Sequence, residues 1–69
     1  MQITLNGGAR TGRDDLTVHH LLIDIDIAPS QKGIAVAVNA EFVSAENWAS
    51  TRLKTGDQVD IVHAVQGGT

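Results

Sequence analysis

The stretch that decides the fold is the end of the chain, Val59-Asp60-Ile61-Val62-His63-Ala64-Val65 followed by Gln66-Gly67-Gly68-Thr69. β-Branched residues dominate the first part, and neither proline nor glycine interrupts it, so it predicts a β-strand. The second part carries no turn or cap signal, and its two consecutive glycines make a thin, conformationally free backbone. A strand that leads into a slim tail suits delivery of a C-terminus into a narrow site on another protein. The alternative is that these glycines are simply trailing residues, as chain ends commonly are.

Length and composition restrict the class of protein. A chain of 69 residues makes one domain, and its 42% hydrophobic and 19% charged residues are typical of a globular protein rather than a disordered one. Cysteine is absent, which excludes disulfides and zinc–thiolate ligation. The net charge of −3 argues against nucleic-acid binding. With no signal-peptide pattern and no apolar run that could span a bilayer, we expect a cytoplasmic protein that does not enter membranes.

The first part of the chain predicts a hairpin. Polar and apolar residues alternate over Gln2–Asn6, which indicates a first strand. Asn6-Gly7-Gly8 supplies residues that tolerate positive φ and therefore a tight reversal. The returning strand, over residues 9–13, is short and arginine-containing, as edge strands often are.

A helix is predicted next. Thr17 is the expected N-cap, and Pro29 sets the latest possible end. Apolar residues at i, i+3, i+4 and i+7 form one face: Val18, Leu21, Leu22 and Ile25. The alternation over residues 23–27 leaves a strand open as the alternative.

The second half predicts three more strands. Gly33–Val38 alternates as a strand, and Asn39-Ala40 is a plausible turn into a short strand over residues 41–44. Residues 45–53 are expected to form a connection that includes one helical turn. A reversal at residues 54–57 then leads into the closing strand.

The resulting order is β-β-α-β-β-β, which defines the fold class as α+β. For this length the best compact solution is the β-grasp architecture, a mixed five-stranded sheet packed on one helix. Its first and last strands lie parallel in the middle of the sheet, and one sheet face stays open to solvent or partners. We therefore expect a β-grasp domain over residues 1–65 and a flexible C-terminal tail over residues 66–69.

Few side chains suggest chemistry of their own. His19 and His20 are neighbours on the expected helix and point about 100° apart, which is poor geometry for one metal ion. His63 has no predictable partner, and Asp24 with Asp26 indicates a solvated rim. No phosphate loop or catalytic triad pattern is present. We expect no metal site and no catalytic residue.

Two features concern packing and docking. Phe42 and Trp48 are both predicted to fill a small core, with a contact-surface role for Trp48 as the alternative. On the closing strand, if Val59 and Ile61 enter the core, the other face carries Val62 and Ala64. We predict that these two residues form a partner-docking stripe that leads into the glycines.

Several stretches of the chain match one family pattern: Met1–Gly7, Thr17-Val18 with Leu21-Leu22, Gly33–Asn39, Val43 with Trp48-Ala49, and above all Gly56–Val62 through Ala64–Gly68. Through these stretches the whole chain resembles the ThiS-type sulfur carriers of thiamine biosynthesis, which are ubiquitin-like β-grasp proteins. Two departures stand out: Asn39-Ala40 replaces a frequent Asn-Gly, and Thr69 follows the second glycine, at which members of the family end.

The resemblance implies a protein cosubstrate rather than an enzyme. An E1-like adenylyltransferase of the ThiF type, using ATP and Mg²⁺, would adenylate the carboxylate of Gly68. A persulfide donor protein would then leave a thiocarboxylate there, and a thiazole synthase of the ThiG type would take the sulfur. Gly67 and Gln66 would form the tail that enters the narrow channel, and Thr69 would mask the carboxylate until a protease removed it.

Three alternatives remain open. The small subunit of molybdopterin synthase shares the fold, the tail and the chemistry. A carrier for another sulfur-transfer pathway would make removal of a residue after the glycines a control step. A β-grasp interaction module without chemistry at its tail is the alternative that Thr69 favours.

Overall fold

The computed structural model describes residues 1–63 of the chain. Its elements are β1 (Gln2–Leu5), β2 (Gly8–Thr11), helix α1 (Val18–Asp24), β3 (Ile34–Val38), β4 (Glu41–Val43), the 3₁₀ helix η1 (Ala45–Ser50) and β5 (Gln58–His63). The predicted order of strands and helix is therefore confirmed. The 3₁₀ helix spans six residues, within the connection for which the sequence predicted one helical turn.

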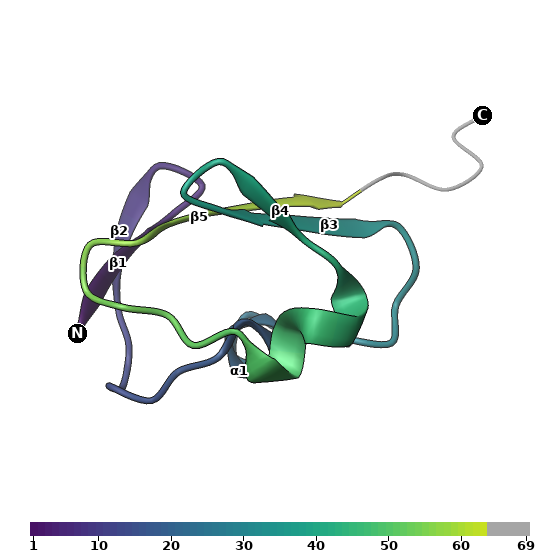
Figure 1. Cartoon of the computed structure of the whole chain (residues 1–69), viewed down its shortest axis with the longest axis horizontal. Coiled ribbons are helices and arrows are strands. Elements are labelled where there is room, and N and C mark those ends of the chain that lie inside the picture. The colour runs from purple at the N-terminus through teal and green to yellow at the C-terminus, as the bar shows by residue number, and fades with distance from the viewer. Residues whose placement is uncertain (64–69) are drawn as a thin grey trace.

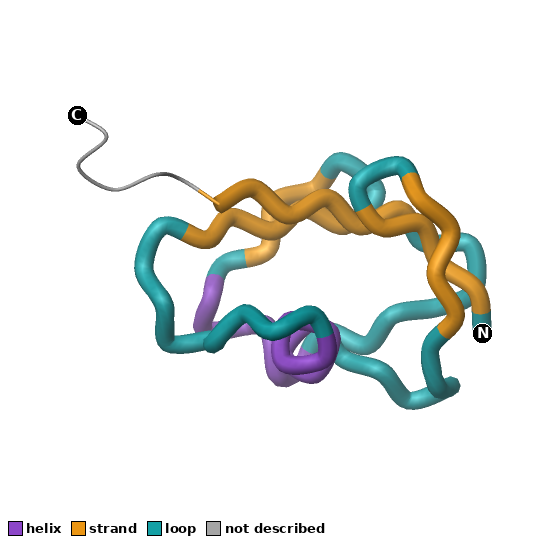
Figure 2. The backbone as a smooth tube through the Cα atoms, turned by 180° about the vertical axis from the view of Figure 1, so that it is seen from behind, coloured by secondary structure: helices purple, strands orange, loops and turns teal. Residues whose placement is uncertain are grey.

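The strands form one mixed sheet in the order β2-β1-β5-β3-β4 (Figure 1). β5 lies at its centre, parallel to β1 and antiparallel to β3. Both helices lie on the same side of the sheet, as the view from behind also shows (Figure 2). This arrangement is the β-grasp fold that the element order predicts, with its first and last strands adjacent and parallel.

Helix α1 begins at a capped end. Thr17 has extended backbone angles, and its hydroxyl oxygen accepts a hydrogen bond from the backbone N–H of His20 at 3.2 Å. The helix ends at Asp24, and Asp26 has a positive φ of 68°. The alternative of a strand over residues 23–27 is thus wrong, because the cap and the apolar face fix helical geometry through Asp24.

A single core fills the space between the sheet and the helices. Its buried members are Ile3, Leu16, Val18, Leu21, Leu22, Val36, Trp48, Leu53, Val59 and Ile61. The Trp48 side chain lies inside it, and its indole N–H donates to the carbonyl oxygen of Val43 at 3.0 Å. A buried indole contributes a large apolar area to the core, and the hydrogen bond of its N–H fixes the orientation of the ring. The prediction that Trp48 lies in the core is therefore confirmed.

Phe42 lies outside this core, and the prediction that it is buried is wrong. Its side chain is 70% exposed. The reason is strand parity: Val43 pairs with the buried Val36, so the preceding residue of β4 points to the opposite face of the sheet.

Two-residue loops connect the strands of two hairpins, β1–β2 and β3–β4. The Asn6-Gly7 loop has φ values of 49° and 86°, and the Asn39-Ala40 loop has φ values of 52° and 69°. Positive φ at both central residues is what a type I′ hairpin loop requires. Ala40 adopts it despite its Cβ, so this second loop carries local strain that a glycine would avoid.

Candidate docking face and tail site

The site is built on β5, which the neighbouring loops hold in register. The backbone N–H of Gln58 donates to Asn39 Oδ1 at 2.9 Å, and that of Ile61 donates to Asn6 Oδ1 at 2.8 Å. Each asparagine thus forms part of a hairpin loop and also binds the central strand. The sequence patterns of both turns consequently position the strand that ends in the predicted tail.

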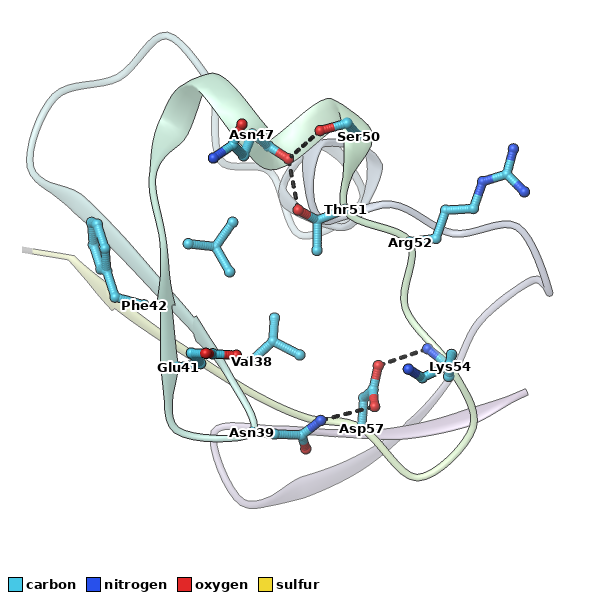
Figure 3. Close-up of a pocket in the computed structure, with 11 residues that line it drawn as sticks. Val38, Asn39, Glu41, Phe42, Asn47, Ser50, Thr51, Arg52, Lys54 and Asp57 are labelled. Atoms are coloured by element: carbon cyan, nitrogen blue, oxygen red, sulfur yellow. Dashed lines mark hydrogen bonds between the residues drawn. The ribbon is translucent and has the colours of Figure 1, made fainter.

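Asp57 anchors the start of β5. Its side chain is buried, with 6% exposure, and one carboxylate oxygen accepts from Asn39 Nδ2 at 3.0 Å. The other oxygen accepts from the backbone N–H of Lys54 at 2.7 Å. Figure 3 shows both bonds. A buried carboxylate needs such partners, so this network closes the 54–57 reversal against the β3–β4 hairpin.

The two faces of β5 differ as the sequence predicts. Val59 and Ile61 are 1% and 9% exposed, and Val62 is 62% exposed on the other face. The predicted parity of the strand is therefore confirmed. The docking role of Val62 remains a prediction.

The other predicted site residues lie outside the described part of the chain. They are Ala64, Gln66, Gly67, Gly68 and Thr69. Gly68 follows His63 by five positions, and a chain of that length spans at most about 18 Å. A partner that acts on Gly68 must therefore approach the β5 end of the domain.

The histidines do not gather into a site. His19 and His20 have ring centroids 5.7 Å apart at an interplanar angle of 71°. His63 Nε2 lies 2.6 Å from Gln31 Nε2, and both side chains are exposed. Within residues 1–63, no three His, Cys, Asp or Glu side chains lie close enough to hold a metal ion. No helical segment of this part of the chain has the length and apolar character that crossing a membrane demands.

A shallow depression borders β4 on the helix side. Its volume is about 450 Å³, and it is lined by Val38, Asn39, Glu41, Phe42, Val43, Asn47, Ser50, Thr51, Arg52, Lys54 and Asp57. Many of its polar groups already bond each other: the hydroxyls of Ser50 and Thr51 donate to the Asn47 carbonyl oxygen, at 3.1 and 2.7 Å (Figure 3). These hydroxyl groups therefore make their hydrogen bonds within the protein.

Sequence reasoning missed one surface residue, Phe42. The sequence did contain a signal for this. If Val43 is assigned to the core, strand alternation turns its neighbour Phe42 to the opposite face of the sheet. Hydrophobicity alone had placed both aromatic residues in the core. The structure places Phe42 on the same sheet face as Val62.

A mixed sheet whose central last strand precedes a double glycine defines a ubiquitin-like β-grasp domain of the carrier type. The model of the ThiS family matches residues 3–68. The chain belongs to the ThiS family, the small sulfur carriers of thiamine biosynthesis.

Individual relatives agree with this assignment. The chain is 37% identical over 68 residues to the sulfur carrier protein ThiS of Escherichia coli K12, covering 99% of this chain and 100% of that protein. It is 32% identical over 68 residues, 99% of this chain, to a segment that makes up 20% of a thiazole synthase of Magnetococcus marinus. The crystal structure of a Geobacter metallireducens ThiS protein superposes with a TM-score of 0.81 at 31% identity, covering 99% of this chain and 100% of that one.

Proposed function

We propose that this chain carries sulfur on the carboxylate of Gly68 and acts as a cosubstrate of other enzymes rather than as a catalyst. The observation that supports this best is the extent of the family match, which runs to residue 68 and so includes both glycines. The match stops before Thr69. Cleavage of the Gly68–Thr69 bond is therefore the first step of the proposal.

The chemistry needs three further steps. The Gly68 carboxylate attacks the α-phosphorus of ATP, pyrophosphate leaves, and an acyl adenylate forms. The terminal sulfur of a protein persulfide then attacks the acyl carbon and releases AMP, which gives an acyl disulfide. A thiol finally cleaves the S–S bond, so that Gly68 keeps a thiocarboxylate and a disulfide forms on the donor side.

The residues at the end of the chain suit this role. Glycine at positions 67 and 68 lacks a Cβ, so it fits a narrow channel that leads to the adenylation site. Gln66 forms the third tail position, and Ala64 with Val62 forms the stripe that leads to it. Because the sulfur is bound as a thiocarboxylate at the C-terminus, this function needs no cysteine side chain in the carrier.

The partners follow from these steps. An E1-like adenylyltransferase supplies the site for ATP and Mg²⁺, a persulfide protein donates sulfur, and a protease exposes Gly68. A thiazole synthase accepts the sulfur, which is supported by the thiazole synthase relative that contains a segment similar to this chain. We place these reactions in the cytoplasm, where ATP is available.

The test compares three chains: one that ends at Thr69, one that ends at Gly68, and one that ends at Gly68 with Gly68→Ala. ATP–pyrophosphate exchange by the adenylyltransferase measures activation, and intact mass detects the exchange of one oxygen for sulfur. We expect only the chain that ends at Gly68 to be activated fully. Equal activity with Thr69 retained would show that Gly68 is not the reacting residue, and inactivity of all three would favour the plain interaction module.

A further inference from the structure

Asn6 binds the end of β5 at the point where β1 can no longer do so. Strand β1 pairs with β5 only as far as Val59, because the chain reverses at the Asn6-Gly7 loop. Asn6 continues the contact in place of a strand. Its backbone N–H donates to the carbonyl oxygen of Val59 at 2.9 Å, and its Oδ1 accepts from the N–H of Ile61 at 2.8 Å.

The two sides of β5 are held differently near its end. On one side, β3 pairs with β5 as far as His63. On the other side, within residues 1–63, the bond from Ile61 to Asn6 is the only hydrogen bond that joins the β5 backbone to the β1–β2 hairpin beyond Val59. A strand that is bonded on one side only opens locally more easily than a strand bonded on both sides. Asn6 therefore decides whether the end of β5 is held on two sides or on one.

The position of this bond matters for the tail. Gly68 follows Ile61 by seven positions, so it can lie at most about 25 Å from that residue. In the proposed activation, the Gly68 carboxylate attacks a phosphorus atom that another protein holds in place. The rate of such a step depends steeply on how well the reacting group is placed. Fixing β5 at Ile61 restricts the directions from which the carboxylate can approach.

Asn39 offers a comparison within the same molecule. It has a φ of 52°, close to the 49° of Asn6, and it also lies in a hairpin loop that binds β5. Its N–H and its Oδ1 bind the carbonyl oxygen and the N–H of Gln58, at 2.7 and 2.9 Å, and its Nδ2 donates to Asp57 at 3.0 Å. Asn39 thus makes a further bond that Asn6 lacks, but at the start of β5. If both residues served stability alone, loss of Asn39 would be the more harmful change.

We propose that Asn6 is a positioning residue for the activation of Gly68. Its side chain acts through the backbone of β5 and touches none of the reacting atoms. The proposal rests on the sulfur-carrier function and adds a residue, far from the tail in sequence, that determines how fast the tail is activated. Asn39 supports the fold without this effect on the reaction.

The experiment compares Asn6→Gly, Asn39→Gly and Asn6→Asp in the chain that ends at Gly68. Glycine removes the side chain at both positions and keeps the positive φ, whereas aspartate retains an acceptor oxygen and tolerates the same φ. We expect Asn39→Gly to lower the free energy of unfolding at least as much as Asn6→Gly does. In pyrophosphate exchange by the adenylyltransferase, only Asn6→Gly should lower kcat, by about tenfold, with KM changed by less than about twofold. Asn6→Asp should keep the kcat of the parent chain.

A second measurement tests the anchor itself. Backbone ¹⁵N relaxation should show lower order parameters at Val62 and His63 in Asn6→Gly and unchanged values in Asn39→Gly. Exchange is measured at a temperature at which every variant is folded. An unchanged kcat for Asn6→Gly would overturn the proposal, and so would equal losses of kcat in the two glycine variants, which would indicate a structural role.

Two other outcomes have separate meanings. A raised KM with unchanged kcat in Asn6→Gly would also overturn the proposal, because it would show that Asn6 contributes to binding of the enzyme rather than to placement of the tail. If even the parent chain is not activated, the sulfur-carrier function fails. The order parameters then decide about the anchor alone: a decrease at Val62 and His63 in Asn6→Gly supports it, and unchanged values overturn it.

Discussion

The two faces of the sheet are built from the same five strands but differ in the exposure of their side chains. On the closed face, Ile3, Val36 and Val59 are at most 2% exposed beneath the helices. On the open face, Phe42 and Val62 are more than half exposed. A chain of this size has enough helix to cover one face only, so its stability comes from the closed face and the open face stays exposed.

The largest expected effect comes from placing one charge on either face of β5. Ile61→Asp buries an unpaired carboxylate and should lower the free energy of unfolding by at least about 4 kcal/mol, enough to unfold much of the protein. Val62→Asp, on the next residue, should change it by about 0.5 kcal/mol or less. Urea denaturation followed by circular dichroism measures both. Similar losses for the two variants would abolish the distinction between the faces.

The two aromatic residues give the second comparison. Trp48→Ala should cost about 3–5 kcal/mol, because it leaves a cavity and an unpaired Val43 carbonyl. Phe42→Ala should cost about 0.5 kcal/mol or less, since its ring is mostly in water. Thermal unfolding of both variants against the parent chain tests this. A large loss for Phe42→Ala would mean that the open face contributes to stability after all.

The Asp57 carboxylate stabilises the reversal at residues 54–57, which leads into β5. Asp57→Ala leaves Asn39 Nδ2 and the Lys54 N–H without their acceptor, and should cost about 1–3 kcal/mol. Asp60→Ala is the matched control, because Asp60 is an exposed carboxylate on the open face of β5, three residues further along the chain. Chemical denaturation should separate the two variants. Equal effects would show that the Asp57 network adds nothing.

The smallest effect concerns the loops that turn the outer strands back into the sheet. Ala40→Gly relieves a positive φ of 69° and should stabilise the fold by a net 0.5–1 kcal/mol or so, after the added freedom of the unfolded chain is subtracted. Gly7→Ala, where φ is 86°, should destabilise by a similar amount. Differential scanning calorimetry resolves shifts of this size. A destabilising Ala40→Gly would show that the second loop is unstrained.

Much of the architecture was predictable because its signals are local. The cap at Thr17, the apolar spacing of Val18, Leu21 and Leu22, and the asparagine turns each specify backbone geometry within a few residues. The alternation of β5 likewise predicted that Val59 and Ile61 are buried and Val62 is exposed. The exposed position of Val62, one of the two residues of the predicted docking stripe, was therefore identified from sequence alone.

Phe42 was predicted wrongly, and the reason is instructive. Hydrophobicity indicates that a residue prefers burial but does not say which face of a sheet the helices cover. β4 is only three residues long, so alternation gave a weak signal there. The register in which β4 pairs with β3 decided which sheet face Phe42 occupies.

The sequence by itself determined the helix, the hairpins, the parity of the last strand and the double glycine that follows it, because each depends on neighbouring residues. The tertiary structure alone decided the registers in which β5 pairs with β1 and β3, that Asn6 and Asn39 bind its backbone, and that Phe42 shares a face with Val62, Ala35 and Ala37. These relations connect residues far apart in the chain. They exist only once hydrophobic burial on the closed face has fixed the order of the strands.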